Sequence, residues 1–195
     1  MTHHHSGGGV FVAITGPSGC GKDAVMRAVS DTIGDNGESG IVFPRRVITR
    51  APEPGEDHEA VAEEEFRRRE QSGAFALTWR AHGLAYGIPV CVADQVDQGR
   101  IAVVNTSRAV LDDVRSAFPV ARAVRVTAPT SVCRDRIFAR GRENADAAER
   151  RLAREDPAPH HPFDLVIENT GTLDDAAERL SAFLLSLRGE GVSHT

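Results

Sequence analysis

Residues 16–23, GPSGCGKD, have the types and spacing of a loop that binds phosphate groups. Glycines at three of the first six positions let the backbone turn, so that successive N–H groups point inward and surround an anion. Lys22, the only lysine in the chain, follows them and is suited to contact the β- and γ-phosphates of a nucleotide. The residues predicted to bind ATP are Gly16, Pro17, Ser18, Gly19, Cys20, Gly21, Lys22 and Asp23.

The last residue of this stretch departs from the common pattern. A Ser or Thr normally follows the lysine, because its hydroxyl binds Mg²⁺, whereas this chain has Asp23. A carboxylate is also a good ligand for Mg²⁺, either directly or through water. Its negative charge repels the phosphates when the metal is absent. We therefore expect ATP binding to depend strongly on Mg²⁺.

Short β-branched runs alternate with helical patterns along the chain, which is typical of a parallel sheet covered by helices. A strand predicted over 10–15 and a helix over 22–33 provide the context that a phosphate-binding loop requires. Further strands are expected at 101–107, 123–128 and 163–170, with an extended segment at 42–49. Further helices are expected at 107–117, 130–139, 146–154 and 172–187. The predicted fold class is α/β, with a P-loop kinase core whose parallel sheet is flanked by helices.

Two regions break this alternation. The first contains an acidic helical run, EEEFRRRE, and then FALTWRAHGLAYGIP, which predicts short strands around a turn. We interpret this region, about 50–99, as a subdomain inserted over the sheet, and the polar region at about 140–151 as a lid. The domain is expected to span 10–188, between a flexible arm or tag remnant at 1–9 and a tail at 189–195.

The size and composition of the chain restrict its function. A chain of 195 residues, 41% hydrophobic and 26% charged, is sufficient for one globular domain. Its net charge of −5 gives no global positive field for nucleic acid or an anionic membrane, and no apolar run is long enough to span a bilayer. The scattered cysteines Cys20, Cys91 and Cys133 indicate neither a disulfide framework nor a zinc site, and they fit a cytoplasmic location. We therefore expect no nucleic-acid or membrane partner.

Several motifs resemble the guanylate kinase family in order and spacing, from about residue 10 to residue 184. They are the glycine loop, Arg50 in VITRAPEPGED, the segment LTWRAHGLAYG, and RGREN followed by RRL. The resemblance implies a P-loop core with a lid and an inserted subdomain that binds the acceptor. It also implies catalytic roles for Lys22 and for two lid arginines, Arg140 and Arg151, which would stabilise charge on the transferred phosphoryl group.

The positions that bind GMP in guanylate kinases differ in this chain. A second arginine for the GMP phosphate is replaced by Glu53, and a tyrosine that binds the same phosphate is replaced by His58. A glutamate that recognises guanine is replaced by Thr78, and a hydroxyl residue that serves the base is replaced by Ile88. Because buried polar groups without partners are costly, the loss of several such contacts argues against GMP as the acceptor. Phosphoryl transfer itself is still expected, since the loop lysine and the lid arginines are present.

A second set of motifs resembles the ribose 1,5-bisphosphate phosphokinases of phosphonate utilisation. These motifs are GPSGxGKD with Asp23, RxITR, HxA at 58–60, WxAxGLxYG, VNxSRA and RGREN. The resemblance implies ATP-dependent phosphorylation of ribose 1,5-bisphosphate to 5-phosphoribosyl 1-diphosphate, with Mg²⁺ as the metal at Asp23. An arginine clamp on an acceptor phosphate is implied at Arg50. The residues that would line the sugar-phosphate pocket are Arg50, His58, Tyr86, Asn105, Ser107 and Arg108.

Alternatives stay open for individual residues and for the whole chain. Arg108 could cap a helix, Tyr86 could be a core aromatic, and Arg151 could be a solvated arginine on a charged helix. The alternative functions are a guanylate kinase-like nucleoside monophosphate kinase and a non-catalytic interaction module of the same fold. The expected partner is a small-molecule sugar phosphate, and a homodimer is one open alternative for the oligomeric state.

Overall fold

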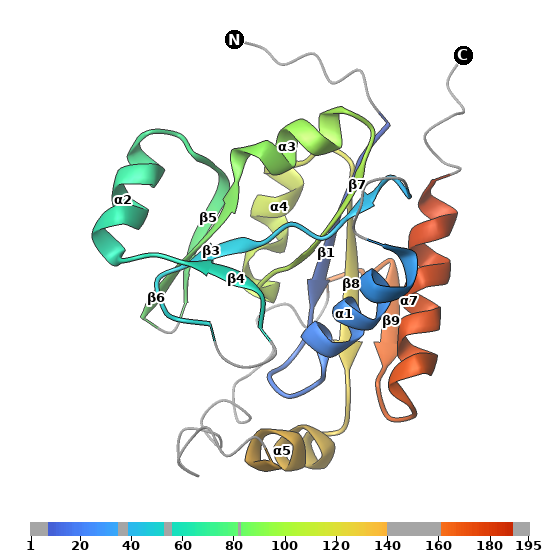
Figure 1. Cartoon of the computed structure of the whole chain (residues 1–195). Helices are drawn as coiled ribbons and strands as arrows, with labels where there is room; N and C mark the ends of the chain where they lie inside the picture. Colours follow the sequence, from blue (N-terminus) through green and yellow to red (C-terminus); the bar gives the residue numbers. More distant parts are fainter. Residues whose placement is uncertain (1–7, 35–38, 53–55, 82, 140–160, 189–195) are drawn as a thin grey trace.

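The computed structural model describes residues 8–34, 39–52, 56–81, 83–139 and 161–188. Its centre is a five-stranded parallel sheet with the strand order β2–β7–β1–β8–β9 (Figure 1). The strands are β1 (Val10–Thr15), β2 (Ile41–Val42), β7 (Ile101–Asn105), β8 (Ala121–Thr127) and β9 (Leu165–Glu168). Parallel strands all end at the same edge of the sheet, so the segments that follow β1, β7, β8 and β9 meet there.

Helices cover both faces of this sheet, which agrees with the predicted α/β class. On one face lie α1 (Lys22–Ile33) and α7 (Leu173–Leu187), which contact each other along their length. On the other face lie α3 (Val90–Asp97), the 3₁₀ turn η1 (Arg108–Val110) and α4 (Leu111–Ala117). A further helix, α5 (Thr130–Ala139), follows β8 at the carboxyl edge of the sheet.

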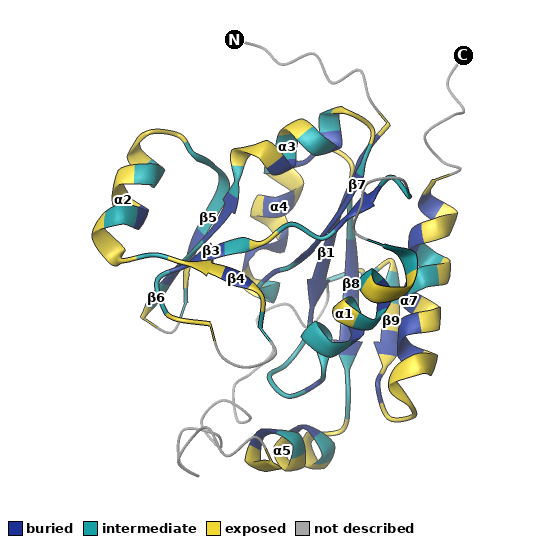
Figure 2. Ribbon diagram, viewed as in Figure 1, coloured by how far each residue is buried: buried dark blue, intermediate teal, exposed yellow. Residues whose placement is uncertain are grey.

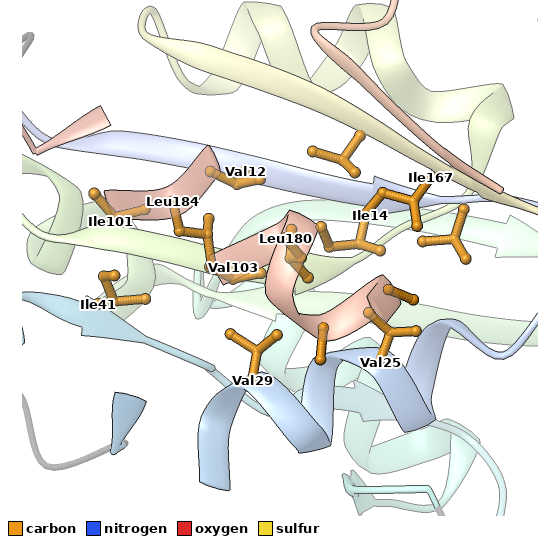
Figure 3. Packing of buried hydrophobic residues seen from close by; sticks show 14 of the residues in the cluster. Val12, Ile14, Val25, Val29, Ile41, Ile101, Val103, Ile167, Leu180 and Leu184 are labelled. Atoms are coloured by element: carbon orange, nitrogen blue, oxygen red, sulfur yellow. The ribbon is translucent and has the colours of Figure 1, made fainter. Parts of the chain in front are cut away.

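The central strand β1 contributes to two hydrophobic cores, because successive side chains of a strand point to opposite faces. Val12 and Ile14 pack among α1 and α7, as Figure 3 shows. Phe11 and Ala13 belong to the core on the other face. All of β1 is buried (Figure 2), which explains why it is a continuous apolar run rather than an alternating one.

A second sheet of four strands lies beside the first, with the order β4–β3–β6–β5. Its elements are β3 (Arg46–Ile48), β4 (His58–Ala60), β5 (Phe75–Ala81), β6 (Leu84–Pro89) and the helix α2 (Glu63–Gln71). Strands β5 and β6 form the antiparallel pair expected around a turn. Trp79 and Ile88 join the core of the second face of the main sheet, so the two sheets pack together.

The helix α2 is attached to the second sheet through one buried side chain, Phe66, which packs with Val47 and Ala85. Its charged residues face solvent (Figure 2) and pair along the helix, for example Arg67 with Glu63 at 3.4 Å. The acidic run is therefore a solvated helix face, held by one buried aromatic side chain and by the surface ion pairs of Arg69 with Glu59 and of Glu70 with Arg80.

The prediction of one continuous extended segment at 42–49 is wrong. It is divided into β2, in the parallel sheet, and β3, in the second sheet. Pro44 lies between the two and has no backbone N–H to continue a ladder. The strand expected to end at Ser107 ends at Asn105, and the helix expected from Ser107 begins as a 3₁₀ turn before α4.

Two described elements, α3 and β4, were not predicted from the sequence. The expected helix at 146–154 lies outside the described residues. None of the helices in the described ranges is both long and apolar enough to cross a membrane.

Candidate active site

The glycine loop, 16–21, joins β1 to α1 at the carboxyl edge of the parallel sheet. Gly16 and Gly21 have positive φ, at 146° and 91°. A Cβ at Gly16 would overlap the carbonyl oxygen of Val126, and a Cβ at Gly21 would overlap Nδ2 of Asn169. Both positions therefore require glycine. Gly21 is also the N-cap of α1, and no described side chain caps that helix, so its first N–H groups are available to an anion.

Lys22 lies across the mouth of this loop. Its Nζ donates hydrogen bonds to the carbonyl oxygens of Gly16 and Pro17, each at 3.0 Å. A phosphate oxygen is a stronger acceptor for an ammonium group than a neutral carbonyl oxygen is. An anion bound by the loop would therefore compete with these two carbonyl oxygens for Lys22.

Two residues to which the sequence analysis gave no role form hydrogen bonds that hold the backbone of the glycine loop. Asn169, buried directly after β9, donates from Nδ2 to the carbonyl oxygen of Cys20 at 2.8 Å. Arg136 on α5 donates to the same oxygen at 3.4 Å and to the carbonyl oxygen of Asn169 at 3.1 Å. Cys133, one turn before Arg136, is buried, and this burial raises the pKa of its thiol. A polar residue at the end of a buried strand, as in IENT, is the signal that could have identified Asn169.

Asp23 connects the start of α1 to the edge of the sheet. Its Oδ1 accepts a hydrogen bond from Nδ2 of Asn105, the last residue of β7, at 2.7 Å. Ser107 lies two residues further on, and its Oγ accepts a hydrogen bond from the N–H of Ala109 at 3.3 Å. Ser107 therefore caps the 3₁₀ turn η1, of which Arg108 is the first residue. The structure brings Asp23 and Asn105 into direct contact and places Ser107 and Arg108 after them on the same edge.

A pocket of about 130 Å³ lies between α1 and the segment that joins β2 to β3. Four of its residues come from α1 at spacings of three and four, which places them on one helix face. The full lining is Asp23, Met26, Arg27, Ser30, Phe43, Pro44, Arg45, Arg46, Asp57 and Asn105. Asp23, the second residue of α1, follows the glycine loop closely and also lines this pocket, so the pocket lies next to the loop.

The predicted acceptor residues Arg50 and His58 lie in one connected group near this pocket, outside its lining. Arg50 pairs with Glu56, with Nη2 at 2.7 Å from Oε2. His58 is buried, with 1% of its surface exposed, and its Nε2 lies 3.1 Å from the carbonyl oxygen of Arg50. Its ring therefore supports the backbone of Arg50. The expectation that His58 lines the pocket is not met, because the side chain faces the interior.

Tyr86 stands in a stack of three flat groups beside the pocket. Its ring lies on Trp79, with centroids 5.1 Å apart and planes 4° apart. The guanidinium carbon of Arg46 lies 6.0 Å from the centroid of the Tyr86 ring. Burial lowers the pKa of Arg46, an effect that Asp23, Tyr86 and Glu56 oppose and Arg50 increases. The side chain is still cationic, because an arginine pKa starts far above neutral pH.

The predicted lid is not described by the structure. Arg140 and Arg151, with the rest of 140–151, lie outside the described residues. Among the described residues, no cluster of three or more His, Cys, Asp or Glu side chains could hold a metal ion.

The chain is similar to known kinases. The family model for guanylate kinase matches residues 10–187. A ribose 1,5-bisphosphate phosphokinase PhnN from Pseudofrankia inefficax is 46% identical over 183 residues, which cover 94% of each chain. A second PhnN, from Acidiphilium cryptum, is 46% identical over 92% of this chain and 94% of the relative. A bifunctional ribose 1,5-bisphosphokinase-thymidine phosphorylase from Cupriavidus pinatubonensis is 42% identical over 89% of this chain and 29% of the longer relative.

Solved structures support the fold independently. The crystal structure of guanylate kinase from Anaplasma phagocytophilum superposes with a TM-score of 0.69 over 95% of this chain and 87% of that protein. Sequence identity between the two is 22%, so this likeness concerns the arrangement of helices and strands and not the substrate.

Proposed function

The chain belongs to the guanylate kinase family and, within it, to the ribose 1,5-bisphosphate phosphokinases, and on that premise we propose that it phosphorylates ribose 1,5-bisphosphate with ATP. An oxygen of the 1-phosphate forms a bond to the γ-phosphorus of ATP. The bond between that phosphorus and the β,γ-bridging oxygen breaks, and ADP leaves with the electron pair. The products are ADP and 5-phosphoribosyl 1-diphosphate, in the context of phosphonate degradation.

The observation that carries this proposal is the adjacency of the glycine loop and the arginine-lined pocket, which share Asp23. The acceptor oxygen belongs to a phosphate and is already largely anionic at neutral pH. No general base is therefore required, and catalysis consists of positioning two phosphate groups and neutralising their charge. The described site agrees with that requirement, since it offers cationic side chains and backbone N–H groups.

On the nucleotide side, the loop from Gly16 to Lys22 binds the phosphates of ATP in this proposal. Backbone N–H groups at the start of α1 point at the β-phosphate, and Lys22 exchanges its two carbonyl partners for phosphate oxygens. The brace formed by Asn169 and Arg136 holds the loop carbonyl of Cys20 away from the anion. The loop is thus ordered before the nucleotide arrives, which lowers the entropic cost of binding.

A divalent metal fits the donor set at the start of α1. Kinases hold Mg²⁺ with one or two protein ligands, together with phosphate oxygens and water. Asp23 would hold Mg²⁺, and Asn105 orients its carboxylate. When bound, Mg²⁺ supplies charge neutralisation at the β- and γ-phosphate oxygens.

On the acceptor side, Arg50 is proposed to bind the 1-phosphate, released from Glu56 as the substrate arrives. His58 positions Arg50 through its backbone, and Tyr86 provides a wall of the site. Ser107 and Arg108 follow Asn105 on the same edge and are proposed to contact the sugar phosphate. Arg140 and Arg151 are proposed to stabilise the transferred phosphoryl group.

The test is an ADP-release assay with purified protein, ATP and Mg²⁺, in which the acceptor is varied. Ribose 1,5-bisphosphate is expected to support turnover, whereas GMP, dGMP and other nucleoside monophosphates are not. ADP release with GMP, together with no ADP release with ribose 1,5-bisphosphate, would favour the nucleoside monophosphate kinase. ATP binding without ADP release on any acceptor would favour the non-catalytic interaction module.

Two further parts of the proposal concern the state of the protein in the cell. We place the enzyme in the cytoplasm, where its three free cysteines stay reduced and ATP is regenerated. Fractionation of the native host followed by immunodetection tests that location. A homodimer is the other part, and size-exclusion chromatography with light scattering measures the mass directly.

A further inference from the structure

The cations around the pocket differ in how they are neutralised. Arg45 pairs with Asp57, with Nε at 2.6 Å from Oδ1. Arg50 pairs with Glu56 at 2.7 Å. Arg46 lies between these two arginines in the sequence, and its side chain lines the pocket. No described residue forms an ion pair or hydrogen bond with that side chain. A half-buried charge without a direct partner is costly for a folded protein, so its presence calls for a ligand that pairs with it.

The guanidinium group of Arg46 is held in place rather than left to move. It lies over the ring of Tyr86, and Tyr86 is itself stacked on the buried ring of Trp79. Its backbone is fixed by pairing with His58 in β4. A planar cation that is positioned before the ligand arrives loses little entropy when it binds two oxygens of one phosphate.

The charges nearest to Arg46 do not neutralise it. Burial lowers the pKa of Arg46, and Arg50 lowers it further, while Asp23 and Glu56 oppose these effects from beyond ion-pair distance. An anion in the pocket would pair with the guanidinium and relieve its repulsion with Arg50. Asp23 and Asn105 line the same pocket and are bonded to each other next to the glycine loop, so the reacting phosphate is expected beside them.

We propose that Arg46 binds the second phosphate of the acceptor, the 5-phosphate that does not react, and thereby selects a sugar bisphosphate over a nucleoside monophosphate. The inference rests on the proposed function and names the residue that sets its specificity. Ribose 1,5-bisphosphate carries its two phosphates at opposite ends of a short sugar, so both can lie within one small site. A nucleoside monophosphate would bring a neutral base towards Arg46 and leave the charge unpaired, which is penalised strongly.

Two substrates and two variants test this assignment. The acceptors are ribose 1,5-bisphosphate and ribose 1-phosphate, which lacks only the 5-phosphate. Arg46→Met keeps the volume of the side chain and removes its charge. The matched control is Arg67→Met, where the arginine is exposed on α2, the helix that packs on the second sheet.

For Arg46→Met, kcat/KM with ribose 1,5-bisphosphate is expected to fall about a hundredfold, the effect of one charge-assisted pair. The value with ribose 1-phosphate should change less than about threefold, because that acceptor never contacts Arg46. For Arg46→Lys, kcat/KM with ribose 1,5-bisphosphate should lie between the values of the wild type and of Arg46→Met, because lysine keeps the charge and lacks the planar guanidinium group. An equal fall with both acceptors, or no fall with either, would overturn the inference.

Binding measurements separate this inference from the proposed function. Calorimetry with a non-hydrolysable ATP analogue gives the Kd of each acceptor without turnover. If the wild type binds ribose 1,5-bisphosphate but releases no ADP, the proposed function fails, and the ratio of Kd values between the two acceptors still decides the role of Arg46. If the wild type binds neither sugar phosphate, both are overturned. The unfolding temperature of Arg46→Met should not fall, because the charge that is removed has no ion-pair partner among the described residues.

Discussion

The glycine loop and the acceptor pocket meet at Asp23 but are built differently. The loop is one continuous stretch whose binding groups are mostly backbone N–H groups, braced by Asn169 and Arg136. The pocket is lined by side chains of α1, of residues 43–46 at the start of β3, of Asp57 just before β4, and of Asn105 at the end of β7. A backbone site recognises any phosphate of the right shape, whereas a side-chain site depends on which residues are present. Substrate choice should therefore reside in the pocket and nucleotide binding in the loop.

The largest expected effect comes from the one loop side chain that reaches the phosphates. Lys22→Ala is expected to lower kcat about a thousandfold, because a charged donor to the transferred group is lost. Its unfolding temperature should stay near that of the wild type, since the partners of Lys22 among the described residues all belong to its own loop: the carbonyl oxygens of Gly16 and Pro17 and the sulfur of Cys20. ADP release measures the activity. Activity within about tenfold of the wild type would remove Lys22 from the catalytic machinery.

Removing the anchor of α2 should damage the pocket side alone. Phe66→Ala deletes a fully buried ring that stacks on Phe75 with centroids 4.7 Å apart, and should cost about 3–5 kcal/mol of stability in the second sheet. The KM for the acceptor should rise while the Kd for ATP stays unchanged. Leu185→Ala on the exposed side of α7 is the matched control. A parallel loss of ATP affinity would show that the two regions are not independent.

A substitution of Asp23, the residue at which the loop and the pocket meet, should change how ATP binding depends on Mg²⁺ and should leave the reaction itself the same. Asp23→Ser removes a negative charge near the phosphates, so ATP affinity without Mg²⁺ should rise and the ratio of affinities with and without Mg²⁺ should shrink on the order of tenfold. Calorimetry with and without EDTA measures both affinities. Asp113→Ser, at an exposed position on α4, is the control. An unchanged ratio in Asp23→Ser would contradict the proposed metal role.

The smallest effect on stability is expected at a surface ion pair that joins β5 of the second sheet to α2. Arg80 donates to Glu70 at 2.8 Å, and this hydrogen bond lowers the pKa of the Glu70 carboxyl group. A lowered folded-state pKa stabilises the protein above the unfolded pKa of Glu70 and ceases to do so as pH falls through the folded pKa. Arg80→Gln should therefore cost less than about 1 kcal/mol at pH 7, because both side chains are partly exposed.

That small cost should disappear in acid, where Glu70 is protonated in both proteins. Urea unfolding at pH 7 and at successively lower pH gives the difference in the free energy of unfolding. A difference that grows as the pH falls would contradict the assigned pair.

Much of the main sheet was predictable because its signals are local. The strand at 10–15 and the helix at 22–33 begin and end where the sequence predicts, and the helix expected from 130 begins at Thr130. Buried parallel strands are continuous apolar runs, and a helix after a glycine loop has a recognisable start. The α/β class and the family resemblance are both confirmed.

The second sheet was less predictable because its signals are weak and its pairing is non-local. Strand β4 has only three residues, two of them exposed, and it exists because it pairs with β3. The segment at 42–49 has one extended pattern but contributes to two sheets; Pro44 marks the break between them, whereas the second sheet that β3 joins is decided by its non-local partners β4 and β6. The resemblance implied that His58 lines the pocket, and no local signal in the sequence shows that its side chain is buried.

The sequence by itself determined the phosphate-binding loop, the α/β class and the family, because each depends on residues close together in the chain. Only the tertiary structure decided which distant side chains meet. It placed Asn169 against Cys20, 149 residues apart, and Asn105 against Asp23, 82 residues apart. It also paired the arginines on either side of Arg46 with acids and left Arg46 lining the pocket without such a partner among the described residues. Such pairings follow from how strands align and helices pack, which no single stretch of sequence encodes.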